Sequence, residues 1–234
     1  MGKVIIACDF AGRQETLSFL EQFGEERPFV KIGMELFYAE GPDIVRTLKG
    51  RGHPIFLDLK LHDIPNTVKK AMRVLSSLDT DIVNLHAAGT RAMMEAALEG
   101  LTRPDGTRPL CIAVTQLTST DQTALEGELG IHLPMEEAVL SYAENARRAG
   151  LDGVVCSPLE AGAVHARCGA DFLCVTPGIR FADGDRGDQK RVMTPGEARR
   201  IGSDYIVVGR PITASADPLA AYLRCLREFE GEEA

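Results

Sequence analysis

Eight short apolar segments recur along the 234-residue chain, with helical patterns between them. They span residues 4–9, 29–33, 55–60, 82–86, 110–115, 153–157, 172–176 and 205–209. Strands that alternate with helices indicate a parallel sheet. Because eight such units close naturally into a barrel, we predict the α/β class and a single (β/α)8 TIM barrel, with one domain over residues 1–234.

Capping residues mark several of the expected helix starts. Ser157 and Thr194 each precede a proline and stand three residues before a glutamate, and Asp217 also precedes a proline. The alternative fold is an open doubly wound sheet. Such a sheet normally has a Gly-x-Gly-x-x-Gly turn after its first strand, and residues 9–13 lack that pattern. The barrel is therefore our prediction.

Composition excludes several classes of function. A net charge of −8 and an isoelectric point near 5.2 argue against a general nucleic-acid-binding surface, so an anionic substrate must be met by local Arg and Lys. The N-terminus lacks the pattern of a signal peptide, and no apolar run is long enough to span a bilayer. We expect a cytoplasmic protein that binds neither nucleic acid nor membrane.

The cysteines and histidines show no metal-binding pattern. None of the six cysteines forms a Cys-x-x-Cys pair, and the five histidines include no close pair. Cys8, Cys111, Cys156 and Cys174 lie in apolar runs, which is typical of small core residues. We expect no structural metal.

Charged residues are concentrated in the segment Asp58-Leu59-Lys60-Leu61-His62-Asp63, which follows the apolar run at 54–57. Asp58 and Lys60 are two residues apart, so they should project from the same face of one strand. Charges at such a position are costly to desolvate unless they neutralise one another. A solvated surface cluster is the alternative, but it has no need of the apolar lead-in.

In a barrel the active site lies at the carboxyl ends of the strands. Polar residues at those ends of the first four predicted strands are Asp9, Lys31, Asp58, Lys60, Asn84 and His86. The last two strands end in Thr-Pro-Gly-Ile-Arg at 176–180 and in Val-Val-Gly-Arg at 207–210. This architecture commonly holds a phosphate there, and the Gly209 N–H and the Arg210 guanidinium could bind it. The polar connection 181–191 is then expected to be an active-site lid, with Gln189 as a neutral phosphate donor.

These segments resemble those of the bacterial orotidine 5'-monophosphate decarboxylase family along essentially the whole chain. The resemblance rests on residues 58–68 (DLKLHDIPNTV), 29–35 (FVKIGME), 114–120 (VTQLTST), 176–180 and 207–210. It implies a carboxy-lyase that converts orotidine 5'-monophosphate to uridine 5'-monophosphate without metal or organic cofactor, in the last step of pyrimidine nucleotide synthesis. It also implies a homodimer with shared active sites.

The resemblance further assigns roles to individual residues. Lys60 would protonate C6, and Lys31, Asp58, Lys60 and Asp63 would form a charged tetrad, with Asp63 supplied by the partner subunit. The remaining substrate contacts would be Asp9 and Lys31 for the ribose, Ile64 and Thr67 of the partner, Thr118 and Pro177 beside the base, and Arg180, Gln189, Gly209 and Arg210 for the phosphate.

Two alternatives remain open. One is a Mg²⁺-dependent sugar-phosphate lyase of the same superfamily, which resembles this chain in the Asp-x-Lys-x-x-Asp motif. Its acidic metal ligand on the second strand is replaced here by Lys31, which would repel a divalent ion. The other is a non-catalytic barrel that binds pyrimidine nucleotides, although a pure binder gains nothing from Asp58 beside an anionic substrate.

Overall fold

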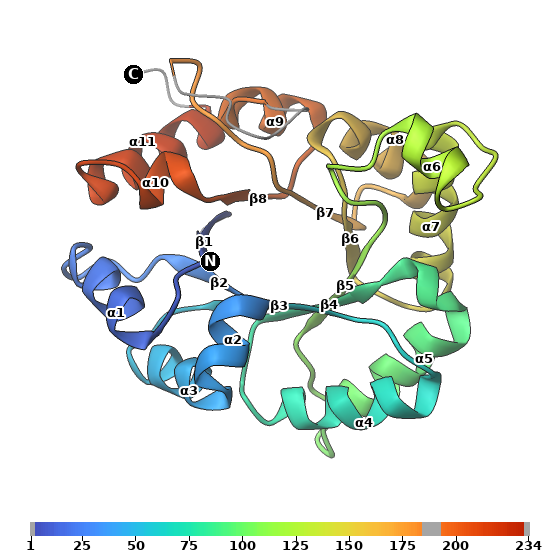
Figure 1. The fold of residues 1–234 in the computed structure, drawn as a ribbon, viewed down its shortest axis with the longest axis horizontal. Helices are drawn as coiled ribbons and strands as arrows, with labels where there is room; N and C mark the ends of the chain where they lie inside the picture. The colour runs from blue at the N-terminus through green and yellow to red at the C-terminus, as the bar shows by residue number, and fades with distance from the viewer. Residues whose placement is uncertain (1–2, 184–192, 232–234) are drawn as a thin grey trace.

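The computed structural model describes residues 3–183 and 193–231, which form a closed barrel of eight parallel strands (Figure 1). The strands follow chain order, and β8 pairs with β1 to close the ring. Their bounds are β1 Val4–Cys8, β2 Phe29–Gly33, β3 Ile55–Leu61, β4 Ile82–His86, β5 Leu110–Val114, β6 Gly153–Val155, β7 Leu173–Thr176 and β8 Tyr205–Val208. The predicted TIM barrel is confirmed.

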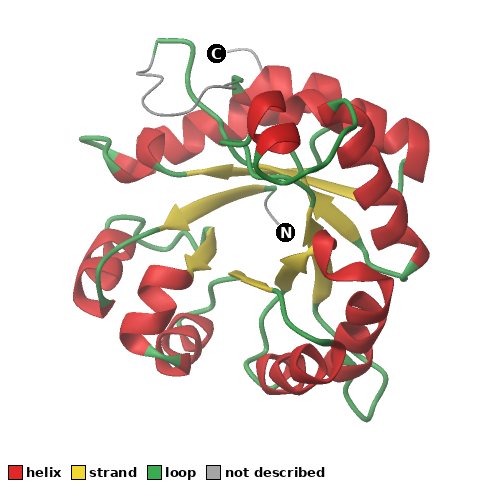
Figure 2. Ribbon diagram, turned by 45° about the vertical axis from the view of Figure 1, so that its right-hand side comes forward, coloured by secondary structure: helices red, strands yellow, loops and turns green. Residues whose placement is uncertain are grey.

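Helices surround the ring of strands (Figure 2). They are α1 Arg13–Glu21, α2 Met34–Glu40, α3 Pro42–Gly50, α4 Pro65–Ser76, the 3₁₀ turn η1 Ala87–Gly89, α5 Thr90–Leu101, α6 Gln122–Gly127, α7 Met135–Arg148, α8 Pro158–Cys168, α9 Pro195–Ile201, α10 Arg210–Thr213 and α11 Pro218–Glu230. Within the described ranges, no helix is long and apolar enough to cross a membrane.

The predicted capping residues begin three of these helices. Ser157 and Thr194 each form a capping box with the glutamate three residues later, at the starts of α8 and α9. The Asp217 carboxylate accepts the Ala220 N–H at 2.9 Å at the start of α11. Each cap satisfies backbone donors that have no partner inside the helix.

Two apolar cores lie on opposite faces of the strands. The larger core packs the outward side chains of the strands against the helices. The smaller one fills the barrel interior, and its buried members are Ile5, Ala7, Phe29, Phe56, Ile82, Ile112, Val175 and Val207. All six cysteines are free and buried, and the four in the apolar runs were predicted to be small core residues. Because both faces of the strands are covered, nearly continuous apolar runs are stable there.

Three aspartates tie neighbouring strands together at the amino-terminal end of the barrel. Asp81, Asp152 and Asp204 directly precede β4, β6 and β8. Each carboxylate accepts the backbone N–H of a residue at the start of the preceding strand, at 2.7, 2.7 and 2.8 Å. Each backbone N–H donates to the carbonyl of that same residue. We call these three residues the aspartate clamps.

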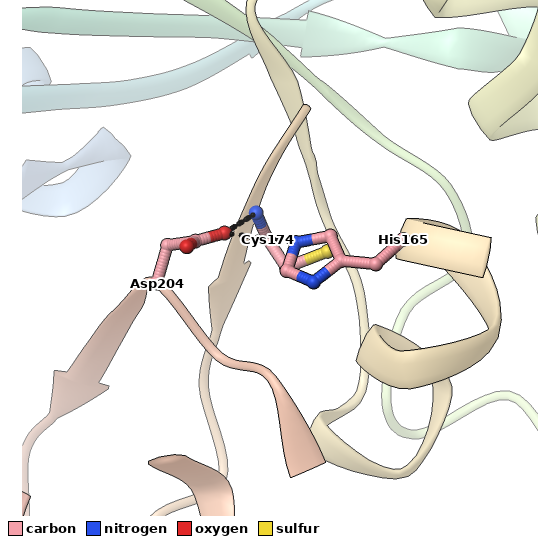
Figure 3. A group of neighbouring side chains, drawn as sticks. All are labelled: His165, Cys174 and Asp204. Atoms are coloured by element: carbon pink, nitrogen blue, oxygen red, sulfur yellow. Dashed lines mark hydrogen bonds and ion pairs between the residues drawn. The ribbon is translucent and has the colours of Figure 1, made fainter. Parts of the chain in front are cut away.

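Every clamp also pairs with a basic side chain. Lys49 and Arg108 pair with Asp81 and Asp152, and His165 Nε2 lies 3.1 Å from Asp204 Oδ2 (Figure 3). The side-chain atoms of His165, Cys174 and Asp204 that could bind a metal all lie within 4.8 Å of one another, which is close enough to suggest a metal site. Asp81 and Asp152 make the same backbone and side-chain bonds as Asp204, but their side-chain partners are Lys49 and Arg108, which do not bind metals. We therefore assign His165, Cys174 and Asp204 a structural role.

Candidate active site

The side chains of β2, β3 and β4 that face the barrel interior form two layers. The first layer is apolar, and the layer two residues further along each strand is polar. Phe29, Phe56 and Ile82 belong to the core inside the barrel. Side chains alternate along a strand, so the residues two positions later face the same interior. Those residues are Lys31, Asp58 and Asn84, and they are 8%, 7% and 1% exposed. The sequence thereby places hydrogen-bonding groups directly above an apolar floor.

Four of the predicted site residues meet above this floor. Lys31 Nζ donates to Asp9 Oδ1 at 2.7 Å and lies 3.4 Å from Asp58 Oδ2. Lys60 Nζ donates to Asp58 Oδ1 at 2.6 Å. Opposite charges therefore alternate from Asp9, which follows β1, through Lys31 and Asp58 to Lys60. Alternation of this kind reduces the cost of holding charges away from water.

Lys31 and Asp58 shift each other's pKa. Burial acts to raise the pKa of Asp58, but the Lys31 and Lys60 ammonium groups and hydrogen bonds from Lys60 and Asn84 outweigh it and lower that pKa. Burial likewise acts to lower the pKa of Lys31, yet Asp58 and Asp9 raise it above its usual value. Asp58 and Lys31 therefore both stay charged at neutral pH.

The backbone of β3 departs from a regular strand at this site. We expected Asp58 and Lys60 to share one strand face, but Lys60 has a φ of 52°, in the left-handed region. The register with β4 also shifts between Leu57 and Leu61. A residue in this conformation costs about 1–3 kcal/mol and persists only where its surroundings hold it. The two side chains still meet, through a bulge rather than through simple alternation.

Asp63, Ile64 and Thr67 lie beside the cluster rather than within it. All three are exposed, at the turn between β3 and α4 and at the start of that helix. Asp63 Oδ1 accepts the Ile64 N–H at 2.7 Å. Among the ion pairs of the described residues, none includes Asp63. These three side chains therefore lie at the surface beside the cluster.

Two histidines flank the same end of the barrel. The rings of His62 and His86 lie 5.6 Å apart, centre to centre. Burial lowers the pKa of His86, and the neighbouring His62 and Lys60 lower it further. The His86 imidazole is therefore neutral at physiological pH.

The residues predicted to bind phosphate lie after β7 and β8. Gly209 is the N-cap of α10, and Arg210 is the first residue of that short helix and is exposed. Pro177 and Arg180 follow β7, where the Arg180 N–H donates to the Met193 carbonyl at 3.0 Å. Thr118 lies in the loop after β5 and is partly exposed. Gln189 and most of the predicted lid lie outside the described residues.

Comparison with known proteins identifies the family. Residues 2–225 match the profile of the orotidine 5'-phosphate decarboxylase / HUMPS family. This chain belongs to that family. It is 59% identical over 232 residues to orotidine 5'-phosphate decarboxylase of Bacillus caldolyticus, covering 98% of this chain and 95% of that protein. It is 57% identical to the enzyme of the same name from Bacillus mycoides, covering 97% of both chains.

Solved structures in the family share the fold. Orotidine 5'-phosphate decarboxylase from Lactobacillus acidophilus superposes with a TM-score of 0.88 at 43% identity, covering 98% of this chain and 99% of the other. A protein from Geobacillus kaustophilus, described as uncharacterized, gives 0.87 at 53% identity and covers 97% of this chain and 99% of its own. The barrel is therefore the fold of this decarboxylase family.

Sequence reasoning noticed Asn84 but gave it no role. In the structure its side-chain amide donates to Asp58 Oδ1 at 2.6 Å and accepts the Lys60 N–H at 2.8 Å. The available signal was its position, two residues after Ile82 inside an apolar run, since an amide there must be paired to be buried. The irregular backbone that creates its partner could not be seen in the sequence.

Proposed function

We propose that this chain decarboxylates orotidine 5'-monophosphate to uridine 5'-monophosphate, with Lys60 as the proton donor to C6. The observation that carries this is the contact between Lys60 Nζ and Asp58 Oδ1 at 2.6 Å, inside an alternating charge cluster at the barrel mouth. The relatives that share most of the chain are named for this decarboxylation. The reaction is the last step of pyrimidine nucleotide synthesis.

The chemistry explains why an ammonium is needed. Loss of carbon dioxide from C6 leaves a carbanion whose electron pair lies in the ring plane, so the ring cannot delocalise it. The enzyme must then supply stabilisation near the upper end of the roughly 8–23 kcal/mol available to enzymes. One charge pair at ~4 Å is worth on the order of 4 kcal/mol at an effective dielectric of about 20. Lys60 supplies both that charge and the proton, and the rest must come from substrate positioning.

Asp58 has two roles in this proposal. It orients Lys60 through the hydrogen bond to Nζ, and it lies beside the carboxylate of the substrate. Because its own pKa is lowered by Lys31 and Lys60 against the effect of burial, it is an anion before the substrate binds. The substrate carboxylate is thus placed where its loss as neutral carbon dioxide relieves repulsion.

Binding far from C6 provides the remaining stabilisation. We assign the phosphate to Gly209, Arg210, Arg180 and Gln189, the ribose to Asp9 and Lys31, and the base to Thr118 and Pro177. Arg210 lies at the N-terminus of α10. Energy from phosphate contacts can fix the reacting carboxyl group near Asp58 and so be converted into rate.

We also propose a homodimer with shared active sites, supported by an apolar pocket of about 710 Å³ beside Lys60. It lies between α2 and α4, and Asp63 and Thr67 line it together with Met34 and Tyr38. Tyr38 is 73% exposed and the nearby Ile64 is 67% exposed. A second copy of the chain would cover these side chains and would bring Asp63, Ile64 and Thr67 to the neighbouring site.

Mixing two inactive variants tests the sharing of sites. Lys60→Ala and Asp63→Ala damage different halves of one shared site, so a heterodimer of the two retains one intact site. Random exchange should restore about one quarter of the parent activity. Mixtures that stay inactive although exchange is shown by mass spectrometry would contradict shared sites.

The Mg²⁺-dependent lyase is disfavoured by the position of Lys31. Its ammonium lies between Asp9 and Asp58, at 2.7 and 3.4 Å, and so occupies the space that a divalent cation would need. A nucleotide-binding barrel without activity is disfavoured by Asp58, since a buried anion beside the substrate carboxylate weakens ground-state binding.

One assay separates these possibilities. Purified protein is incubated with orotidine 5'-monophosphate in the presence of EDTA, and the loss of substrate absorbance is followed. We expect full turnover, because we propose that the reaction needs no metal or organic cofactor. Activity abolished by EDTA and restored by Mg²⁺ would favour the lyase, and binding without turnover would favour the sensor. A cytoplasmic location remains part of the proposal.

A further inference from the structure

We infer that Asn84 is a positioning residue for this reaction: its side-chain amide holds the Asp58 carboxylate and the Lys60 backbone together, so that the Lys60 ammonium points at C6. The inference rests on the proposed role of Lys60 as proton donor. It concerns a residue that contacts the charged groups and not the substrate.

The geometry of β3 and β4 places Asn84 opposite the bulge. Leu57 pairs with Val83 and Leu61 pairs with Leu85. Between these pairs β3 has three residues, 58–60, while β4 has only Asn84. The ladder therefore leaves the Lys60 N–H without a backbone acceptor on β4, and Asn84 Oδ1 accepts it at 2.8 Å. The Asn84 side-chain amide thus replaces the backbone acceptor that a regular β-ladder would provide.

The orientation of the Asn84 amide is fixed by chemistry. The Lys60 N–H can only donate, so the atom facing it must be the amide oxygen. Asp58 is ionised and can only accept, so the atom facing Oδ1 at 2.6 Å must be the amide nitrogen. The two contacts demand the same orientation. Asn84 is also only 1% exposed, so water does not compete for it.

Asn84 also fixes the rotation of the Asp58 carboxylate. Asp58 Oδ1 receives both Asn84 Nδ2 and Lys60 Nζ, whereas Oδ2 faces Lys31 at 3.4 Å. Without the amide, the carboxylate could turn toward Lys31, and the left-handed conformation of Lys60 would lose its acceptor. Both changes would move the Lys60 ammonium while leaving the phosphate and ribose contacts in place.

The neutral charge of the amide matters as well. A carboxylate at this position would repel Asp58, and an ammonium would compete with Lys60 for it. An alkyl group would leave the Lys60 N–H unpaired in a buried site and would remove one of the two hydrogen bonds that Asp58 Oδ1 accepts. An amide provides one donor and one acceptor at the required positions without changing the charge of the cluster.

The test compares Asn84→Ala and Asn84→Asp with the parent enzyme and with Asn145→Asp, a matched control at an exposed position on α7. For Asn84→Ala we expect kcat to fall by about 10–100-fold, as for other groups that orient active-site residues, while the affinity for uridine 5'-monophosphate changes by less than about threefold. A structural defect would lower both kcat and the affinity for uridine 5'-monophosphate.

The Asn84→Asp variant gives a pH signature. Once protonated, the introduced carboxyl group can donate to Asp58 and accept from Lys60, as the amide does. The kcat/KM ratio of variant to parent should therefore rise as the pH falls from 8 to 5. The ratio is used because the other titratable groups of this end of the barrel, Asp9, Lys31, Asp58, Lys60, His62 and His86, are present in both proteins.

Three results would overturn the inference: parent-like kcat in Asn84→Ala, a loss of nucleotide affinity that matches the loss of kcat, or a ratio for Asn84→Asp as flat with pH as that of Asn145→Asp. If Asn84→Ala does not fold, the isosteric Asn84→Asp variant decides alone. Lys60→Ala is measured alongside. Substantial turnover in that variant would reject the proton donor, whereas full turnover in Asn84→Ala beside an inactive Lys60→Ala would reject only the role of Asn84.

Discussion

At the amino-terminal end of the barrel, Asp81, Asp152 and Asp204 each accept a backbone N–H from the neighbouring strand. At the carboxyl-terminal end, the hydrogen bonds that Asp58 accepts in the described structure come from the side chains of Lys60 and Asn84. The aspartate clamps lie on regular strand ends, whereas Asp58 begins a bulge in which Lys60 has a positive φ. Aspartate thus binds backbone groups at one end of the barrel and holds side chains of the proposed active site at the other.

The difference shows how the molecule separates stability from chemistry. A carboxylate bonded to backbone reinforces the fold wherever that backbone is regular. A carboxylate bonded to ammonium groups holds those groups in position. The left-handed backbone at Lys60 that allows this contact lowers the stability of the fold. Substitutions at the two ends should therefore affect different measurements.

The largest expected effect is at the active end. Lys60→Ala should lower turnover by about 10³-fold or more, because it removes the proton donor and the charge beside C6. Binding of uridine 5'-monophosphate, followed by calorimetry, should be retained, and the free energy of unfolding should change by less than about 1 kcal/mol, since Lys31 still neutralises Asp58. Substantial residual decarboxylation would reject the assignment.

The opposite pattern is expected at a clamp. Asp152→Ala should lower the free energy of unfolding by about 3 kcal/mol, because the Cys111 N–H and the Arg108 guanidinium lose their acceptor. Urea denaturation measures this change, and kcat of the folded protein should stay within about twofold of the parent. Asp43→Ala at an exposed helix position is the control. A comparable loss of turnover would break the separation between the two ends.

The pH dependence of stability distinguishes the charged cluster. Because the pKa of Asp58 is lowered, its ionisation stabilises the fold above the unfolded-state value of about 4, and this is lost as the pH falls through the folded-state pKa. The raised pKa of Lys31 contributes stability below about 10.4 that is lost as the pH rises through its folded-state value. The parent should therefore be more stable than Asp58→Asn at neutral pH, and this advantage should shrink as the pH falls through the folded-state pKa of Asp58. An advantage that stays unchanged over that acid range would contradict the lowered pKa of Asp58.

The smallest effect is expected for the basic partner of a clamp. His165→Ala should lower the free energy of unfolding by about 1 kcal/mol, because Asp204 keeps its bond to the Cys174 N–H and loses only a partly exposed partner. Chemical denaturation of this variant beside Asp152→Ala gives the comparison. A loss as large as that of Asp152→Ala would mean that the side-chain partner, and not the backbone bond, stabilises the clamp.

Much of this architecture could be predicted because it depends on local patterns. Alternation of apolar runs with capped helices predicted eight strands closed into a barrel, and Ser157 and Thr194 marked helix starts where the structure has capping boxes. Asp58 and Lys60 were predicted to meet, and they do. The clamps also had a signal that we did not use, since each aspartate directly precedes an apolar run.

The sequence by itself determined the barrel and the identities of the charged residues, because strand alternation and the carboxyl ends of parallel strands bring Lys31 and Asp58 to one layer. Only the tertiary structure decided the bulge at 58–60 and the role of Asn84 in filling it. The physical reason is that a left-handed residue such as Lys60 is unfavourable in isolation, and only an acceptor from the neighbouring strand makes that conformation stable.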